Sequence, residues 1–248
     1  IMLTRRVNNQ DIRIDNVSVK EVLGQEVVPD SGCGSWLLEP QSTNLITQSE
    51  DFSDSSWSKG GTSVVSGVSS PDGATNAFKL VESATTGTHS VYTSTPTLLA
   101  VDYSFSVFAK AGENTTFRTQ VYDGTNFHYA IFNLSTGVVS VENLLNSSDI
   151  KLFANGYYKC SINFTSSAGV GYSYVQLIDG SDNITYQGDG TSGIYIYGAM
   201  LEQQSYSTSY IPTQGAISTR LRDIATNSGN ASLINSESGV LYAEISAL

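Results

Sequence analysis

Charged residues are scarce in this sequence, and basic residues are the scarcer kind. Only 14% of the 248 residues are charged, and 12 Lys and Arg stand against 23 Asp and Glu, which gives a formal net charge of −11. A strongly acidic surface repels the phosphate backbone of DNA and RNA. The composition therefore predicts that nucleic acid is not a partner.

Histidine and cysteine are nearly absent. Neither of the two histidines, His89 and His128, has a second His, Cys or carboxylate at the spacing that metal ligands require. Cys33 sits in a glycine-rich turn, and Cys160 falls in the apolar register of a strand. We expect a loop thiol and a buried free thiol, with a disulfide left open as the alternative. The two cysteines do not decide the redox compartment.

Long apolar runs are also missing. No segment is long and apolar enough to cross a bilayer, and the opening I-M-L-T-R-R lacks the apolar stretch of a signal peptide. We therefore expect no membrane insertion. The opening does not resemble a natural translation start either, which leaves open that the chain is a piece of a longer protein.

Motifs of common enzyme classes do not fit their required context. Gly188, Gly190 and Gly193 match G-x-G-x-x-G, but a dinucleotide site needs a helix after this motif, and here a strand follows. There is no G-x-S-x-G, and no histidine signature makes Cys160 a nucleophile. No carboxylate pair stands out, because most acidic residues sit in turns or at strand ends. The sequence predicts no enzyme, and a glycosidase or lyase stays as a weaker alternative.

What the sequence does contain is a regular series of short strands. Tyr, Ser, Thr, Asn and Gly are abundant, which is typical of extracellular all-β domains. Asp-Gly pairs at 123–124 and 179–180 and an Asn-Gly pair at 155–156 indicate tight turns. No helical period interrupts the pattern, so the sequence predicts an all-β, antiparallel β-sandwich. The eight predicted strands are 77–82, 90–93, 103–110, 116–122, 127–134, 157–164, 172–178 and 194–201.

The strand at 194–201 alternates between two faces that both carry large residues. Ile194, Ile196 and Met200 are expected on one face, and Tyr195, Tyr197 and Leu201 on the other. A strand with two such faces is packed on both sides. In the strand at 103–110, by contrast, Tyr103, Phe105 and Val107 alternate with serines, which predicts a strand with one polar face.

Four segments carry a resemblance to a known family. They read G-D-G-T-S-G-I-Y-I-Y-G-A-M-L-E from 188, Y-S-T-S-Y-I-P from 206, W-L-L-E-P-Q-S-T-N-L-I from 36 and S-E-D-F-S-D-S-S-W from 49. Over about 35–225 the chain resembles a jelly-roll, carbohydrate-binding-module-like domain. This family is found in tail fibre, spike and head-appendage proteins of bacteriophages and prophages. Related jelly rolls belong to secreted polysaccharide-degrading enzymes.

The two ends resemble parts of neighbouring modules. I-D-N-V-S-V, within 1–30, resembles the closing strand of such jelly rolls, so 1–30 is expected to be the terminal strand of an upstream module plus a linker at 24–34; a first strand of the main domain is the alternative. The jelly roll is expected at 31–225. At 226–248, S-G-V-L-Y-A-E-I-S-A-L resembles a linker and the first strand of a concanavalin-like lectin module. Unpaired terminal strands favour assembly into a homo-oligomer, with a trimer as the expected state.

Aromatic residues on the predicted strands are the candidate carbohydrate-binding set. Tyrosines stack on sugar rings and donate a hydroxyl group, although core or inter-subunit packing is the competing interpretation for each of them. Trp57 is a candidate platform or else a core residue, and His128 is a candidate surface or groove residue. The full set is Trp57, Tyr122, His128, Tyr129, Tyr172, Tyr174, Tyr195 and Tyr197.

A structural calcium ion is left open, with no other cofactor expected. Asp179, Asp182 and Asp189 lie in one loop region and could supply oxygen ligands. However, 198–199 reads Gly-Ala where the related closing strand, I-D-N-V, carries Asp-Asn. The carboxylate that serves calcium in related modules is thus missing from that place.

The resemblance implies a non-enzymatic virion structural protein, extracellular and assembled with other virion proteins. Its expected task is attachment to host-surface glycan or oligomeric scaffolding. The alternative is a carbohydrate-binding module of a secreted polysaccharide-degrading enzyme. The sequence does not name the glycan or the host.

Overall fold

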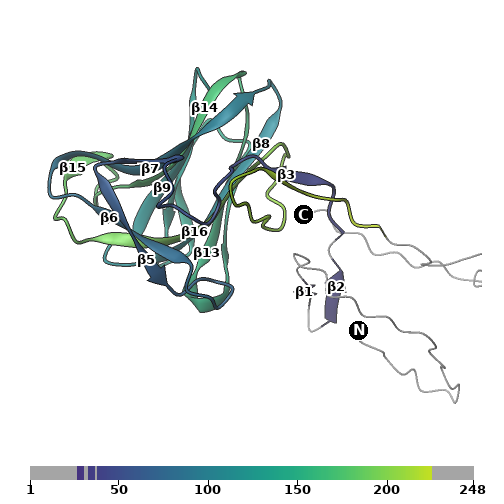
Figure 1. Ribbon diagram of the computed structural model, residues 1–248, viewed down its shortest axis with the longest axis horizontal. Coiled ribbons are helices and arrows are strands. Elements are labelled where there is room, and N and C mark those ends of the chain that lie inside the picture. Colours follow the sequence, from purple (N-terminus) through teal and green to yellow (C-terminus); the bar gives the residue numbers. More distant parts are fainter. Residues whose placement is uncertain (1–26, 31–32, 37, 225–248) are drawn as a thin grey trace, which may run out of the picture.

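The computed structural model describes residues 27–30, 33–36 and 38–224, and it is an antiparallel β-sandwich (Figure 1). This confirms the predicted all-β fold class and is consistent with a jelly roll. The strand expected from I-D-N-V-S-V within 1–30 and the strand expected within 226–248 lie outside the described residues. None of the described residues belongs to a helix with the length and hydropathy needed to cross a membrane.

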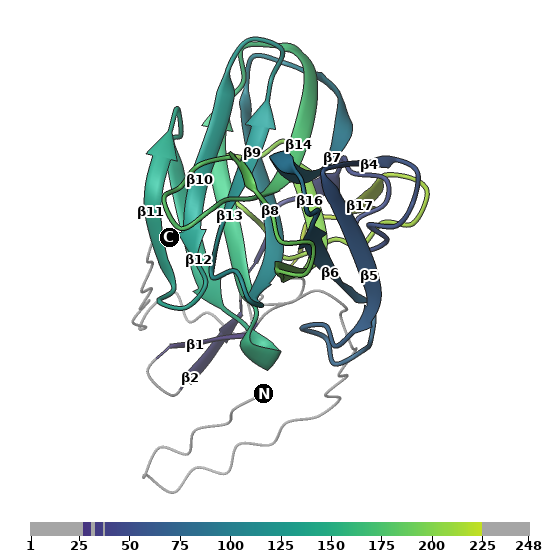
Figure 2. The ribbon, with the colours of Figure 1, turned by 90° about the vertical axis from the view of Figure 1, so that its left-hand side faces the viewer.

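Two sheets form the layers of the sandwich. The seven-stranded sheet contains, in spatial order, β11 (Val138–Asn143), β10 (Phe127–Asn133), β9 (Thr116–Tyr122), β14 (Gly169–Leu177), β7 (Thr86–Leu98) and β15 (Thr185–Gln187), and β4 (Trp57–Gly60) also pairs with β7. The six-stranded sheet contains β12 (Ser147–Leu152), β13 (Tyr158–Thr165), β8 (Asp102–Ala111), β16 (Gly193–Glu202), β6 (Ala77–Glu82) and β5 (Thr62–Val68). In Figure 2 both series cross the view in this order, from β11 and β12 on one side to β4 and β5 on the other.

Three short elements complete the described fold. Strand β1 (Val27–Asp30) pairs with β2 (Cys33–Trp36), so part of the expected linker at 24–34 forms a two-stranded hairpin. Strand β3 (Ser42–Asn44) pairs with β17 (Ser218–Arg220). A 3₁₀ turn, η1 (Ala154–Gly156), contains the expected Asn-Gly turn.

The core lies between the inner faces of the two sheets. Strand β8 directs Tyr103, Phe105 and Val107 into it, as the alternation predicts. Ser104 and Ser106 lie on the other face of β8 and are also buried, so this strand is covered on both sides rather than on one. Cys160 is a buried free thiol in the core, where burial raises its pKa, as expected for an inert cysteine.

All eight predicted strands are present, as β6, β7, β8, β9, β10, β13, β14 and β16. The prediction missed several edge strands, among them β5, β11 and β12. Their residues alternate between exposed and half-buried positions, so they lack the apolar signal of a central strand.

A β-bulge in β16 reverses the facing that the sequence predicts for the last residues of this strand. The register shifts between Tyr197 and Met200, where Gly198 adopts a φ of 60°. The bulge changes the alternation, so Leu201 rather than Met200 joins Ile194 in the main core. The expected facing of Met200 and Leu201 was therefore wrong.

The polypeptide enters and leaves the sandwich at one place. The Glu39 N–H donates to a carboxylate oxygen of Asp223 at 2.9 Å, and the Asp223 N–H donates to the Glu39 carbonyl at 3.0 Å. Beside them, the Arg220 guanidinium forms an ion pair with the Glu39 carboxylate, whose side chain is only 4% exposed. Figure 1 shows β3 next to the yellow-green end of the described chain.

We predict that this ion pair stabilises the domain. Replacing Arg220 with Met leaves the Glu39 carboxylate buried without its counter-ion, so the free energy of unfolding should fall by about 2–4 kcal/mol. Urea denaturation measures the change. Arg222→Met, at an exposed position, is the matched control and should shift stability by less than about 0.5 kcal/mol. Equal effects of the two variants would contradict the prediction.

Candidate functional site

The outer face of the seven-stranded sheet carries a concentration of aromatic residues. Strands β7, β9, β10 and β14 direct alternate residues into the core, so the residues between them face outward. The strand register places these outward residues in three rows, which we call the tyrosine face. The rows are Ile131-Arg118-Gln176-Ser90, Tyr129-Gln120-Tyr174-Tyr92 and Phe127-Tyr122-Tyr172-Ser94.

The aromatic rings of this face lie close together and are partly open to solvent. The rings of Tyr92 and Tyr174 stack with centroids 5.0 Å apart, and Tyr172 lies 6.2 Å from Tyr92 and 6.3 Å from Tyr174. Tyr122 and Phe127 form a second pair at 4.7 Å, and Phe127 is 48% exposed. Burial and the neighbouring tyrosines raise the pKa of Tyr174, so its hydroxyl group stays protonated at neutral pH. The face thus offers ring surfaces together with hydroxyl groups.

Polar side chains lie between the rings. The Arg118 guanidinium carbon lies 3.5 Å from the centre of the Tyr129 ring, and an Arg118 Nη donates to the Gln120 side-chain oxygen. Burial lowers the pKa of Arg118 from its ordinary value. Its cross-strand neighbour Gln176 is buried and also belongs to this face.

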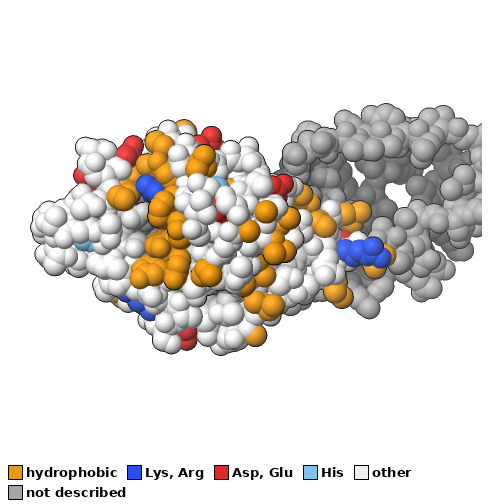
Figure 3. Space-filling view, turned by 90° about the horizontal axis from the view of Figure 1, so that it is seen from above, with side chains coloured by type: hydrophobic (Ala, Val, Ile, Leu, Met, Phe, Trp, Pro, Cys, Tyr) orange, Lys and Arg blue, Asp and Glu red, His pale blue; other side chains and the backbone are white. Residues whose placement is uncertain are grey.

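The face is free of carboxylates although the chain is acidic. None of the residues in the three rows is Asp or Glu, whereas the whole sequence contains 23 of them. Figure 3, the view from above, shows hydrophobic side chains gathered in a band with a Lys or Arg group beside it, and acidic groups that lie outside the band, most of them near the outline. In Figure 1 the strands β7, β9 and β14 are the upper layer, over β5, β6 and β16.

Four of the predicted binding residues come together here: Tyr122, Tyr129, Tyr172 and Tyr174. The sequence analysis missed Tyr92, although it lies in a predicted strand and alternates with Val91 and Thr93. It also missed Arg118, Gln120, Phe127 and Gln176. Their alternation with core residues placed them on an outer face, but no signal in the sequence paired β9 with β14 and β14 with β7.

Trp57 is part of the core and is not a surface platform. Its side chain is 1% exposed, its indole N–H donates to the Gln48 carbonyl at 2.7 Å, and its ring packs 4.8 Å from Phe52. Of the two interpretations of Trp57, a sugar platform or a core residue, the structure agrees with the core residue.

The sequence analysis expected His128 to be a surface or groove residue. This expectation is wrong, because the His128 side chain is buried. Its ring stacks on Phe164 at 4.5 Å, with Nδ1 2.7 Å from the Leu144 carbonyl and Nε2 2.9 Å from an Asp123 carboxylate oxygen. It links the β9–β10 turn to the loop after β11. Its role in this structure is to position the end of the tyrosine face.

Tyr195 and Tyr197 belong to the other sheet. With Phe108, Tyr157 and Tyr210 they form a small cluster on the outer face of the six-stranded sheet. The Tyr197 hydroxyl lies 2.9 Å from a Glu50 carboxylate oxygen and 3.0 Å from an Asp72 carboxylate oxygen, and its one proton can be donated to either, which ties loops over this face. These two tyrosines pack against their own domain and do not join the tyrosine face.

Asp179 and Asp182 lie in one turn after β14, where the Asp182 N–H donates to the Asp179 carbonyl at 3.1 Å, and Asp189 lies in the next loop, after β15. The Asp179 carboxylate accepts hydrogen bonds from Ser181 and Asn183, and the Asp189 carboxylate accepts them from Thr191 and Ser192. Asp182 is exposed at a turn position with a φ of 63°. Within residues 27–30, 33–36 and 38–224, no group of three or more His, Cys, Asp or Glu side chains is arranged to hold a metal ion.

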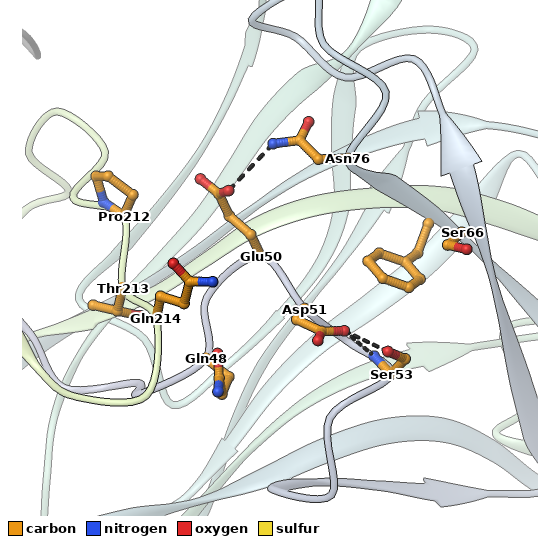
Figure 4. Close-up of a pocket in the computed structure, with 10 residues that line it drawn as sticks. Gln48, Glu50, Asp51, Ser53, Ser66, Asn76, Pro212, Thr213 and Gln214 are labelled. Carbon is orange, nitrogen blue, oxygen red and sulfur yellow. Dashed lines mark hydrogen bonds between the residues drawn. The ribbon is translucent and has the colours of Figure 1, made fainter.

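An open pocket of about 620 Å³ lies at another place, between the loop after β3 and the segment after β16 (Figure 4). Its carboxylates are already engaged by the protein: Glu50 accepts from Asn76 at 3.2 Å and from Tyr197, and Asp51 accepts from the Ser53 N–H at 2.9 Å. Phe78 is the one aromatic side chain in its lining. The tyrosine face therefore offers more ring surface than this pocket. Its ten lining residues are Gln48, Glu50, Asp51, Ser53, Ser66, Asn76, Phe78, Pro212, Thr213 and Gln214.

Comparisons with known proteins do not assign the chain to a family. No protein-family model and no curated protein matches the sequence. One solved structure that matches is the CBM22-1–GH10 portion of endo-1,4-beta-D-xylanase 10B from Clostridium thermocellum, complexed with xylohexaose. The match has 14% identity and a TM-score of 0.39 and covers 70% of this chain and 30% of that chain. A likeness at this level carries no information about the ligand, and the phage resemblance stays an expectation.

The turn between β9 and β10, at the end of the tyrosine face, contains Asp123, whose carboxyl group should make the stability of the domain depend on pH. Burial alone would raise the pKa of Asp123, but the Asn126 N–H, the His128 ring and the N–H groups of Ser167 and Thr125 hold it well below its usual value. A carboxyl group with a depressed pKa stabilises the fold above the unfolded-state pKa of about 4, and this contribution is lost as pH falls from there toward the folded-state pKa.

Asp123→Asn should therefore lower the free energy of unfolding by about 2–3 kcal/mol at pH 6. The gap between the parent and the variant should narrow below about pH 4. Urea denaturation at several pH values measures it. Asp182→Asn, at an exposed turn, is the control, and a gap that is unchanged at pH 3 would contradict the argument.

Proposed function

We propose that this chain is a non-catalytic carbohydrate-binding domain that holds a glycan on the tyrosine face. The observation that supports the proposal is the group of half-buried rings of Tyr92, Tyr172 and Tyr174, which lie within 6.3 Å of one another on the open side of the sandwich. Sugar rings have apolar C–H faces that pack on aromatic rings, and their hydroxyl groups need donors and acceptors nearby. The rows between β10 and β7 contain both kinds of group.

The geometry of the face suits an extended ligand. Its rows cross β10, β9, β14 and β7, and neighbouring strands lie about 5 Å apart, so a row of four residues is about 15 Å long. That length fits several sugar units in a chain rather than one monosaccharide. Since binding uses protein side chains alone, the proposal requires no cofactor.

The wider setting is also a proposal. The resemblance to phage tail fibre, spike and head-appendage domains favours a virion structural protein outside the cell, assembled as a homo-oligomer with other virion proteins. In that setting the glycan belongs to the host surface. The second candidate is a binding module of a secreted polysaccharide-degrading enzyme, and the tyrosine face serves either role.

We predict that removing one central ring abolishes most of the binding. The purified domain is applied to a glycan array of plant and bacterial polysaccharides, and the strongest ligand is then titrated by calorimetry. Tyr174→Ala removes the ring at the centre of the face and should weaken binding at least about tenfold, a loss of about 1.4 kcal/mol.

Tyr206→Ala is the matched control, since Tyr206 is 49% exposed outside the tyrosine face. It should leave the affinity unchanged. Circular dichroism checks that both variants keep the fold. If the domain binds no glycan, or if both variants bind as well as the parent, the proposed function is wrong.

The pocket of Figure 4 provides a test of where the ligand binds and of catalysis. The double variant Glu50→Gln, Asp51→Asn keeps the size of both side chains and removes both charges. It should bind the glycan with unchanged affinity, and neither it nor the parent should shorten the polysaccharide in a reducing-end assay. If the parent shortens the polysaccharide and the double variant does not, the domain is an enzyme, and the proposal of a non-catalytic domain is wrong.

A further inference from the structure

We infer that the tyrosine face selects acidic glycans and that the Arg118 guanidinium holds their anionic group. This inference rests on the proposed function and names its substrate class. The face contains one fixed cation, Arg118, among aromatic rings, and none of the residues in its three rows is a carboxylate.

The guanidinium of Arg118 is held in one orientation. It lies flat enough on Tyr129 for its carbon to be 3.5 Å from the ring centre, and one of its Nη atoms donates to Gln120. A cation held by a ring and a hydrogen bond loses little conformational freedom when it binds a ligand. Arg118 is therefore preorganised to donate to an anion.

Arg118 has no carboxylate counter-ion in the described part of the chain. Lys79 pairs with Glu113 and Arg220 pairs with Glu39, but no carboxylate in the described part of the chain forms an ion pair with Arg118. Its Nε atom is buried and has no hydrogen-bond partner among the described residues. A half-buried cation without a counter-ion is costly, and an anionic ligand reduces that cost.

The neighbour of Arg118 supplies the complementary group. Gln176 pairs with it across β9 and β14, is only 6% exposed, and has a side-chain oxygen without a partner in the described structure. An N–H donor and a C=O acceptor thus lie at adjacent positions. An acidic sugar carries an acceptor anion next to donor hydroxyl groups, which matches this arrangement.

The local charge favours an anion even though the chain carries a net charge of −11. At physiological salt, charges more than about 8 Å apart are largely screened, so the groups within the face dominate. Those groups include one cation and no Asp or Glu.

The experiment compares matched acidic and neutral ligands. The glycan array described above is extended with polysaccharides that contain uronic acid, sialic acid or sulfate. The best acidic ligand is titrated in its native form and after its charge is removed, by carboxyl reduction or by desulfation. We expect acidic glycans to bind best, removal of the charge to weaken binding at least about tenfold, and added salt to weaken it further.

Two substitutions test the role of Arg118 itself. Arg118→Gln removes the charge and should reduce the affinity for the acidic ligand about tenfold while leaving that for the neutral form within about twofold. Arg118→Lys keeps the charge without the planar fork and should recover part of the loss. Arg222→Gln makes the same charge change at an exposed position outside the face and should have no effect.

The outcomes separate the two proposals. Equal binding of native and neutral ligands, with Arg118→Gln unchanged, would overturn the inference and leave the proposed function standing. No binding to any glycan would overturn both. Whichever treatment weakens binding, carboxyl reduction or desulfation, identifies the anionic group that the face uses.

Discussion

The whole architecture depends on burying one face of each sheet against the other. Strands alternate their side chains, so every apolar residue that β9 or β14 directs inward fixes the outward direction of its neighbours. Phe117 and Val121 lie in the core, and Arg118 and Tyr122 consequently lie outside. The same constraint that stabilises the sandwich thus also arranges the tyrosine face, and a one-residue slip would destroy both.

The two outer faces of the sandwich differ in how they are covered. On the six-stranded sheet, the domain covers β8 and β16 with its own aromatic residues, including Tyr157 and Tyr210. On the seven-stranded sheet, Tyr92, Tyr172 and Tyr174 stay partly exposed, and no described segment is packed over them in the same way. This asymmetry distinguishes rings that stabilise the fold from rings that can contact a ligand.

The placement of carboxylates follows the same division. Glu202 is fully buried and accepts hydrogen bonds from Ser42 and from the N–H and hydroxyl groups of Thr208. Asp123 and Glu39 likewise satisfy buried donors, at a hairpin turn and where the chain enters the domain. These acidic groups hold loops and ends together, whereas the tyrosine face contains none. An acidic protein can thereby present a surface that does not repel an anionic sugar.

The sequence by itself determined the fold class, the eight central strands and the inward or outward facing of most of their residues, because apolar alternation and turn residues are local signals. It could not separate Tyr172 and Tyr174 from Tyr195 and Tyr197, since all four alternate with core residues in the same way. It also could not reveal the bulge at Gly198 or the burial of His128. Only the tertiary structure decided which strands are neighbours. Pairing β14 with both β9 and β7 joins residues 50 or more positions apart, and long-range pairing of this kind leaves no mark in any single segment.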